Sequence, residues 1–96
     1  HTLNEQEIVM STLKVKFYSD PGHGWVAVKR QLLVDLGILD KITLYSYQKG
    51  NTVYLEEDCD FSTLMTALSN KGIALELDRK CTNKSSPIRC YQRFMA

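Results

Sequence analysis

Alternation of apolar and polar residues predicts that the chain begins its folded part with two β-strands. From Leu13, apolar residues occupy every second position through Val15 to Phe17. A period of two is typical of a strand with one buried face. Two glycines and a proline at positions 19–24 then require a turn, and residues 25–28 predict a second, shorter strand.

Helical spacing of apolar residues predicts two α-helices. The first is expected around residues 29–36 and ends before Gly37. The second follows Asp58 or Asp60, either of which could serve as its N-cap. Both helices are expected to end in a Schellman motif, in which a left-handed glycine is followed by an isoleucine that contacts the helix. The apolar stripe of the second helix consists of Phe61, Leu64, Met65 and Leu68.

Four further segments predict strands. Residues 41–47 and 52–55 are rich in β-branched and aromatic residues and flank a turn at 48–51, which predicts a hairpin. Residues 73–78 and 88–94 alternate again between apolar and polar positions. The predicted order is therefore strand, strand, helix, strand, strand, helix, strand, strand.

This order predicts a two-layer α+β domain. Short connections make most neighbouring strands antiparallel, and two amphipathic helices need an apolar sheet face to cover. We expect a mostly antiparallel sheet of about six strands with two helices on one face, in a single domain over residues 13–96. Residues 1–12 are expected to be a flexible lead-in. His1 is not a translation start, so part of this segment could derive from an expression vector, and Met10 is a candidate native start.

Composition restricts the class of protein without identifying it. A chain of 96 residues supports one hydrophobic core. Its 44% hydrophobic and 24% charged residues are typical of a globular domain, and no apolar run is long enough to span a membrane. The net charge of +1 predicts neither nucleic acid nor a membrane as a partner.

Cysteine and histidine positions predict no metal, no cofactor and no catalytic residue. The odd set Cys59, Cys81 and Cys90 follows no recognisable secretory leader, so we expect reduced thiols and a cytoplasmic location. A bridge between Cys81 and Cys90 is left open as the alternative. No pair of cysteines or histidines has the spacing of a metal site. A hydrolase built on Asp20 and His23 is a further hypothesis, for which no substrate can be proposed.

Aromatic residues provide the best sequence pattern for a binding function. The loop before the second strand carries His23 and Trp25, which either present a binding surface or form a turn with a buried tryptophan. In the hairpin, Tyr45 and Tyr47 are expected to point outward together while Leu44 faces the helices. Tyrosine and tryptophan bury a large area and keep a polar tip, as interfaces require. The predicted protein-interaction residues are His23, Trp25, Tyr45 and Tyr47.

A basic C-terminal segment supports nucleic-acid binding as the alternative function. From Arg79 onward every charged residue is positive, and arginine and tyrosine on a strand face can bind phosphates and stack on bases. An ordinary solvated strand face explains the same pattern, because half-exposed strands need a polar side. The residues of this alternative are Arg79, Lys80, Arg89, Tyr91 and Arg93.

Three short segments of the chain carry a resemblance to other proteins. They are YSDPGHGW at residues 18–25, YSYQ at residues 45–48 and YLEEDCD at residues 54–60. Together these segments resemble a group of small uncharacterised proteins from bacteriophages, prophages and plasmids. The resemblance implies a bacterial or phage setting, transfers no catalytic residue, and implies that the protein acts by binding a host protein. We therefore predict a non-enzymatic protein-interaction module, with an edge strand, such as the last one, available for a homodimer.

Overall fold

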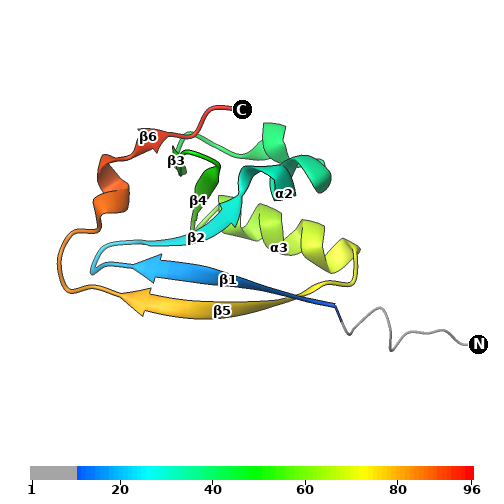
Figure 1. Ribbon diagram of the computed structural model, residues 1–96, viewed down its shortest axis with the longest axis horizontal. Helices are drawn as coiled ribbons and strands as arrows, with labels where there is room; N and C mark the ends of the chain where they lie inside the picture. Colours follow the sequence, from blue (N-terminus) through cyan, green and yellow to red (C-terminus); the bar gives the residue numbers. More distant parts are fainter. Residues whose placement is uncertain (1–10) are drawn as a thin grey trace, which may run out of the picture.

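The computed structural model describes residues 11–96, so positions 1–10 of the predicted lead-in lie outside the described residues. Within the described range the chain forms six strands, two α-helices and two short 3₁₀-helices (Figure 1). In chain order the elements are β1 Thr12–Ser19, β2 Gly24–Lys29, α2 Arg30–Asp35, η1 Leu39–Lys41, β3 Tyr47–Lys49, β4 Thr52–Glu56, α3 Asp60–Asn70, β5 Ala74–Cys81, η2 Pro87–Cys90 and β6 Gln92–Arg93.

All six strands belong to one sheet with the order β5-β1-β2-β4-β3-β6. The prediction of an α+β domain with about six strands is confirmed. β5 runs parallel to β1 over eight paired residues, whereas the other neighbouring strands are antiparallel. The sheet is therefore mixed. A parallel pair needs a connection much longer than a hairpin turn, and the chain between β1 and β5, which includes α3, supplies it (Figure 1).

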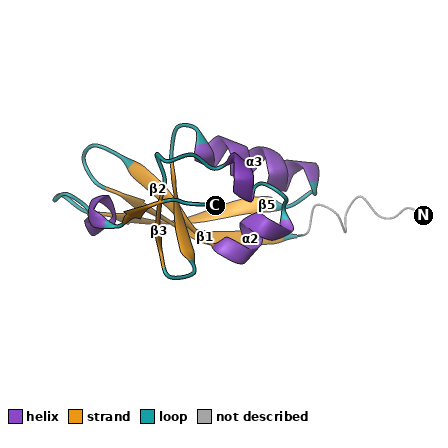
Figure 2. Ribbon diagram, turned by 90° about the horizontal axis from the view of Figure 1, so that it is seen from above, coloured by secondary structure: helices purple, strands orange, loops and turns teal. Residues whose placement is uncertain are grey.

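The core lies between one sheet face and the two helices. Val15 and Phe17 of β1 point into it as predicted, and Leu33 of α2 packs in the same cluster as Leu64 and Leu68 of α3. α3 packs against β4 and β5, whereas α2 packs against β2 and η1. Figure 1 shows both helices above the β1–β5 pair, and Figure 2 shows them at the same end of the molecule in the view from above. The predicted layering is corrected in one respect: α2 begins directly after β2 and packs at the end of that strand and on η1, not across the sheet as α3 does.

Both helices end as the sequence predicts. Gly37 and Gly72 have φ angles of 72° and 70°, in the left-handed region that favours glycine. After α2, the N–H of Ile38 donates to the carbonyl of Leu33 at 3.0 Å, and the corresponding bond follows α3. These hydrogen bonds define Schellman motifs at both helix ends.

The prediction that Asp58 or Asp60 caps the start of α3 is wrong. Glu56 performs this role, because its Oε1 accepts a hydrogen bond from the N–H of Asp60 at 2.7 Å and another from that of Cys59. Its Oε2 accepts from the N–H of Asp58 at 2.8 Å. One glutamate at the end of β4 thus accepts the N–H groups of residues 58–60 where the helix begins, and it leaves the carboxylate of Asp60 available for other contacts.

Two of the predicted strands are much shorter than expected. β3 starts only at Tyr47, and residues 42–46 form an irregular turn, because the N–H of Thr43 bonds to a buried carboxylate instead of a strand. The predicted strand over 88–94 is replaced by η2 and the two-residue β6. Ser86 starts η2 by accepting a hydrogen bond from the N–H of Ile88 at 3.2 Å, and the proline that follows has a φ angle suited to a helical turn.

Truncation of Leu64 to alanine should lower the free energy of unfolding by about 2–5 kcal/mol, because this side chain is fully buried in the core. Met65 was predicted in the same stripe but is 43% exposed, so Met65→Ala should cost less than about 1 kcal/mol. Urea unfolding of the two variants measures the difference. Equal losses would mean that α3 packs with a different face toward the sheet.

Candidate functional site

The sheet face opposite the core is rich in aromatic side chains, and we call it the open face. The register pairs Tyr18 with Trp25 and Tyr47 with Tyr54, and paired residues point to the same side of a sheet. Trp25 lies edge-on to Tyr47, with 6.2 Å between ring centroids. The ring of Tyr54 is 6.2 Å from that of Tyr18 and 5.2 Å from that of Tyr91, which reaches the face from the C-terminal segment.

One ion pair holds the C-terminal segment to the loop between β1 and β2. Oδ2 of Asp20 accepts a hydrogen bond from Nε of Arg89 at 2.6 Å, and Oδ1 accepts one from Nη2 at 2.8 Å. The same carboxylate accepts backbone N–H bonds from Ser86, Gly22 and His23, each at 2.9 Å. The Asp20 side chain is only 1% exposed. We call this set of contacts the Asp20 clasp.

The local sequence explains why the clasp forms at this loop. An aspartate before a proline and a glycine favours a turn in which its carboxylate accepts nearby backbone N–H bonds. A Cβ atom at Gly22 would lie 2.7 Å from Nη2 of Arg89. A side chain at this position would therefore displace the end of the Arg89 side chain, and the backbone N–H bonds of the turn hold the carboxylate that Arg89 contacts.

The clasp fixes the charges of both partners. Arg89 and the N–H of Ser86 bond to the charged carboxylate, which holds the pKa of Asp20 well below its usual range. The pKa of Arg89 is raised, because the same bond stabilises the charged guanidinium. His23 contacts Asp20 through its backbone N–H and not through its imidazole. The hypothesis of a hydrolase that uses these two residues therefore gains no acid–base pair from this geometry.

Trp25 lies beneath the clasp. The guanidinium carbon of Arg89 is 5.4 Å from the centroid of the indole, and Trp25 is 2% exposed. The interpretation of this loop as a turn with a buried tryptophan is confirmed. His23 is exposed beside it, with 6.1 Å between the two ring centroids. Of this predicted pair, only the imidazole is accessible to a partner.

A second buried carboxylate organises the turn before β3. Asp60 is 1% exposed, and it accepts hydrogen bonds from the N–H and the hydroxyl of Thr43, at 3.0 and 2.8 Å from its Oδ2, and from the hydroxyl of Ser46. Ser46 in turn accepts the N–H of Glu56 at 3.0 Å. Between these fixed ends lie two side chains with high exposure, Leu44 at 68% and Tyr45 at 67%. We call residues 43–46 the presentation turn.

The predicted outward pair of Tyr45 and Tyr47 is corrected by this turn. Tyr45 lies in the presentation turn, whereas Tyr47 lies in β3 under the guanidinium of Arg93, whose central carbon is 4.5 Å from the ring centroid. Leu44 was expected to face the helices and is exposed instead, because residues 42–46 do not follow the alternation of a strand. Ile42, at the start of these residues, is buried.

The basic residues of the nucleic-acid alternative do not form one surface. Arg79 pairs with Phe17 in the register and lies over its ring at 5.2 Å, on the core side of the sheet. Arg89 is engaged in the clasp, and Lys80 lies 3.6 Å from Asp78. The structure brings together the remaining members, Tyr91 and Arg93, with the predicted protein-interaction residues His23, Trp25 and Tyr47 on the open face.

Sequence reasoning missed four residues that shape these sites: Asp20 as the centre of the clasp, Asp60 as the anchor of the presentation turn, and Tyr18 and Tyr54 on the open face. The Asp-Pro-Gly sequence was a usable signal for Asp20. The alternation in β1 and β4 was a signal for the two tyrosines. For Asp60 no local signal existed, because its partners come from a turn fourteen or more residues away.

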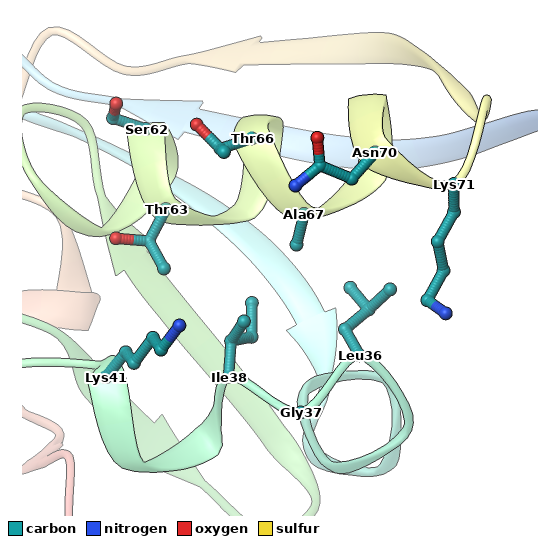
Figure 3. Close-up of a pocket in the computed structure, with 10 residues that line it drawn as sticks. All are labelled: Leu36, Gly37, Ile38, Lys41, Ser62, Thr63, Thr66, Ala67, Asn70 and Lys71. Atoms are coloured by element: carbon teal, nitrogen blue, oxygen red, sulfur yellow. The ribbon is translucent and has the colours of Figure 1, made fainter.

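A polar groove of about 510 Å³ lies between α3 and the segment that joins α2 to η1 (Figure 3). Hydroxyl groups of Ser62, Thr63 and Thr66 line one side, and the side chains of Lys41 and Lys71 lie near its two ends (Figure 3). Its lining contains no acid, histidine or cysteine. The groove thus provides hydroxyls and positive charge but no acid–base pair.

Other chemistry has few candidates in the part of the chain that the structure describes. No group of three or more histidine, cysteine, aspartate or glutamate side chains within residues 11–96 could hold a metal ion. The thiols of Cys59, Cys81 and Cys90 are free and exposed. Over the same residues, no helix has the length and apolar character that a membrane crossing requires.

Comparison with known proteins adds no relative: no family model, no curated protein and no solved structure matches this chain. Fold and site geometry alone define it as a small α+β protein with an open sheet face, a clasped C-terminal segment and one apolar presentation turn.

Asp20→Asn should lower the thermal stability at neutral pH, because it removes the charge that pairs with Arg89. A carboxylate with a lowered folded-state pKa stabilises the fold above its unfolded pKa, close to 3.8, and this contribution is lost as the pH falls below that value. Between about pH 7 and about pH 3, the midpoint of thermal unfolding should therefore fall less for Asp20→Asn than for the wild type.

Asp78→Asn is the matched control for this measurement, because Asp78 pairs with Lys80 on the surface and its side chain is 41% exposed. Exposed pairs contribute little to stability. If both variants lose the same stability and keep the same acid dependence, the Asp20 clasp does not hold the C-terminal segment.

Proposed function

We propose that the protein is a non-enzymatic binding module that docks on a protein partner through the presentation turn. The supporting observation is the exposure of two large neighbouring side chains, Leu44 and Tyr45, on a turn whose ends are fixed by the buried Asp60. Exposed apolar groups on a rigid turn carry a solvation cost in the free protein that a partner can relieve.

Preorganisation of the turn strengthens this proposal. The hydroxyl of Thr43 donates to Asp60 and accepts the N–H of Tyr45 at 3.2 Å, so the backbone at the tip is held on its N-terminal side. On the other side the carbonyl of Ser46 accepts the N–H of Phe94 at 2.9 Å, and Nη1 of Arg93 donates to the carbonyl of Leu44 at 3.2 Å. A turn fixed before binding loses little conformational entropy in a complex.

The chemistry of the turn indicates the kind of partner. A leucine and a tyrosine with polar tip suit an apolar pocket with a hydrogen-bond acceptor at its rim. Arg93, next to the turn, would favour an acidic neighbour in that pocket. With the resemblance to phage and plasmid proteins, we propose a host bacterial protein in the cytoplasm as the partner. A homodimer by sheet extension would use β5, because β6 has only two residues.

Leu44→Ser combined with Tyr45→Ser should reduce capture of the partner from a bacterial lysate by about tenfold or more, because both anchoring side chains are lost. The measurement is a pull-down with the purified protein as bait, followed by quantification of each captured band. The fold should be unchanged in the circular dichroism spectrum, since both residues are exposed.

Val34→Ser combined with Met65→Ser is the matched control, because these side chains are also large, apolar and exposed, at 48% and 43%, but lie on the helices. The control should keep the band that the turn variant loses. A band that survives in both variants, or disappears from both, contradicts docking through the presentation turn.

A further inference from the structure

The open face carries a group of lysines that the presentation turn does not involve. The register places Lys29 and Lys49 on either side of Thr52, and Lys16 next to Ala27. Paired residues on neighbouring strands point to the same side of a sheet. Three exposed ammonium groups therefore project from the face that carries Tyr18 and Tyr54.

These three lysines have no acidic partner among residues 11–96. Three acids share the open face in the register. Glu76 is paired with Lys14, and Asp78 lies opposite Lys16 but is paired with Lys80. Glu56 of β4 lies opposite Trp25, and its carboxylate accepts backbone N–H groups at the start of α3. The ion pairs of the described residues are Lys14–Glu76, Lys80–Asp78 and Arg89–Asp20. The middle of the open face is therefore positive, although the whole chain has a net charge of only +1.

Tyrosine rings lie among these charges. Tyr18, Tyr54 and Tyr91 form a chain of half-buried rings with centroid distances of 6.2 and 5.2 Å. The ammonium of Lys49 is 4.8 Å from the centroid of Tyr91. Burial and the neighbouring phenols Tyr91 and Tyr18 raise the pKa of Tyr54, so its ring is neutral at physiological pH. Neutral rings beside ammonium groups can stack on bases while the charges bind phosphates.

A hollow of about 710 Å³ adjoins these rings where β1 and β2 separate beyond the Lys16–Ala27 pair. Lys16, Lys29, Tyr18 and Tyr54 line it on the open face together with Ala27, and apolar residues of the core side, among them Leu13, Val28 and Leu32, line the rest. Lys14, which is paired with Glu76, and one acid of α2, Asp35, complete its charged lining. The volume lies within the range of small-molecule pockets and accommodates a nucleobase.

We propose that the open face binds single-stranded nucleic acid, with phosphates at Lys16, Lys29 and Lys49 and bases stacked on the Tyr18–Tyr54–Tyr91 chain. This surface differs from the presentation turn, and it shares only Tyr91 with the C-terminal set that the sequence indicated. A single strand is favoured over a duplex, because only unstacked bases expose their faces to tyrosine rings. An acidic protein would match the lysines but would leave the stacking surface without a specific use.

Fluorescence anisotropy with a labelled oligothymidine of about 12 nucleotides at about 50 mM salt tests the proposal. The wild type should bind, and Lys16→Gln combined with Lys29→Gln should weaken binding about tenfold. The slope of log affinity against log salt should become shallower by about 1.4, corresponding to two lost phosphate contacts. Tyr54→Leu should weaken binding about fivefold or more with an unchanged salt slope, because it removes stacking and no charge.

Lys41→Gln combined with Lys71→Gln is the matched control, because it changes the net charge equally at the groove between α2 and α3, away from the open face. This control should bind within about twofold of the wild type. The Leu44→Ser/Tyr45→Ser protein should also bind normally, which separates this proposal from docking through the presentation turn.

Four results would overturn the proposal. The first is that the wild type does not bind the oligothymidine at about 20 mM salt. The second is that the Lys16/Lys29 and Lys41/Lys71 double variants lose the same affinity, and the third is that a duplex of the same length binds as tightly as the single strand. The fourth is that a glutamate-rich peptide of the same charge competes as effectively as unlabelled oligothymidine. The last result would assign the open face to an acidic protein instead of a nucleic acid.

Discussion

The pairing of Asp20 with Arg89 is the constraint on which the open face depends. It joins a loop near the start of the domain to a segment near its end, 69 residues apart in the sequence. The rest of the segment that follows β5 is held by the burial of Ile88 and Phe94, by the two-residue β6 and by the hydrogen bond from the N–H of Phe94 to the carbonyl of Ser46. Because the carboxylate also organises its own loop, a single side chain decides both where the C-terminal segment lies and how Trp25 is covered.

Asp60 plays a comparable part on the other side of the sheet. Both carboxylates are buried, and each is satisfied by several donors, so each fixes an irregular segment that has no regular secondary structure of its own. The two surfaces proposed for binding are products of these contacts: the presentation turn depends on Asp60, and the position of Tyr91 on the open face depends on the segment that Asp20 holds. Buried acids therefore act here as structural anchors, which position other residues for binding.

Local patterns were sufficient for the regular elements and insufficient for the irregular ones. Alternation in β1, the apolar stripe of α3 and the two glycine helix ends were all visible along the chain, and the structure agrees with them except at Met65, which is exposed. The β-branched run before β3 and the alternation after Pro87 looked like strands, but carboxylates and a capped 3₁₀ turn override them. The parallel pairing of β5 with β1 and the identity of the acid partners depend on contacts between distant segments, which no local pattern encodes.

Acrylamide quenching of tryptophan fluorescence tests the Asp20 clasp most directly, because Trp25 is the only tryptophan of the chain and lies beneath Arg89. The wild type should be strongly protected from the quencher. In the Arg89→Ala protein, the indole of Trp25 should become clearly more accessible to acrylamide. The helical circular dichroism signal should stay unchanged, since α2 and α3 pack on other parts of the sheet. A wild-type tryptophan that is quenched as readily as free indole, or an Arg89→Ala protein with unchanged protection, would contradict the account.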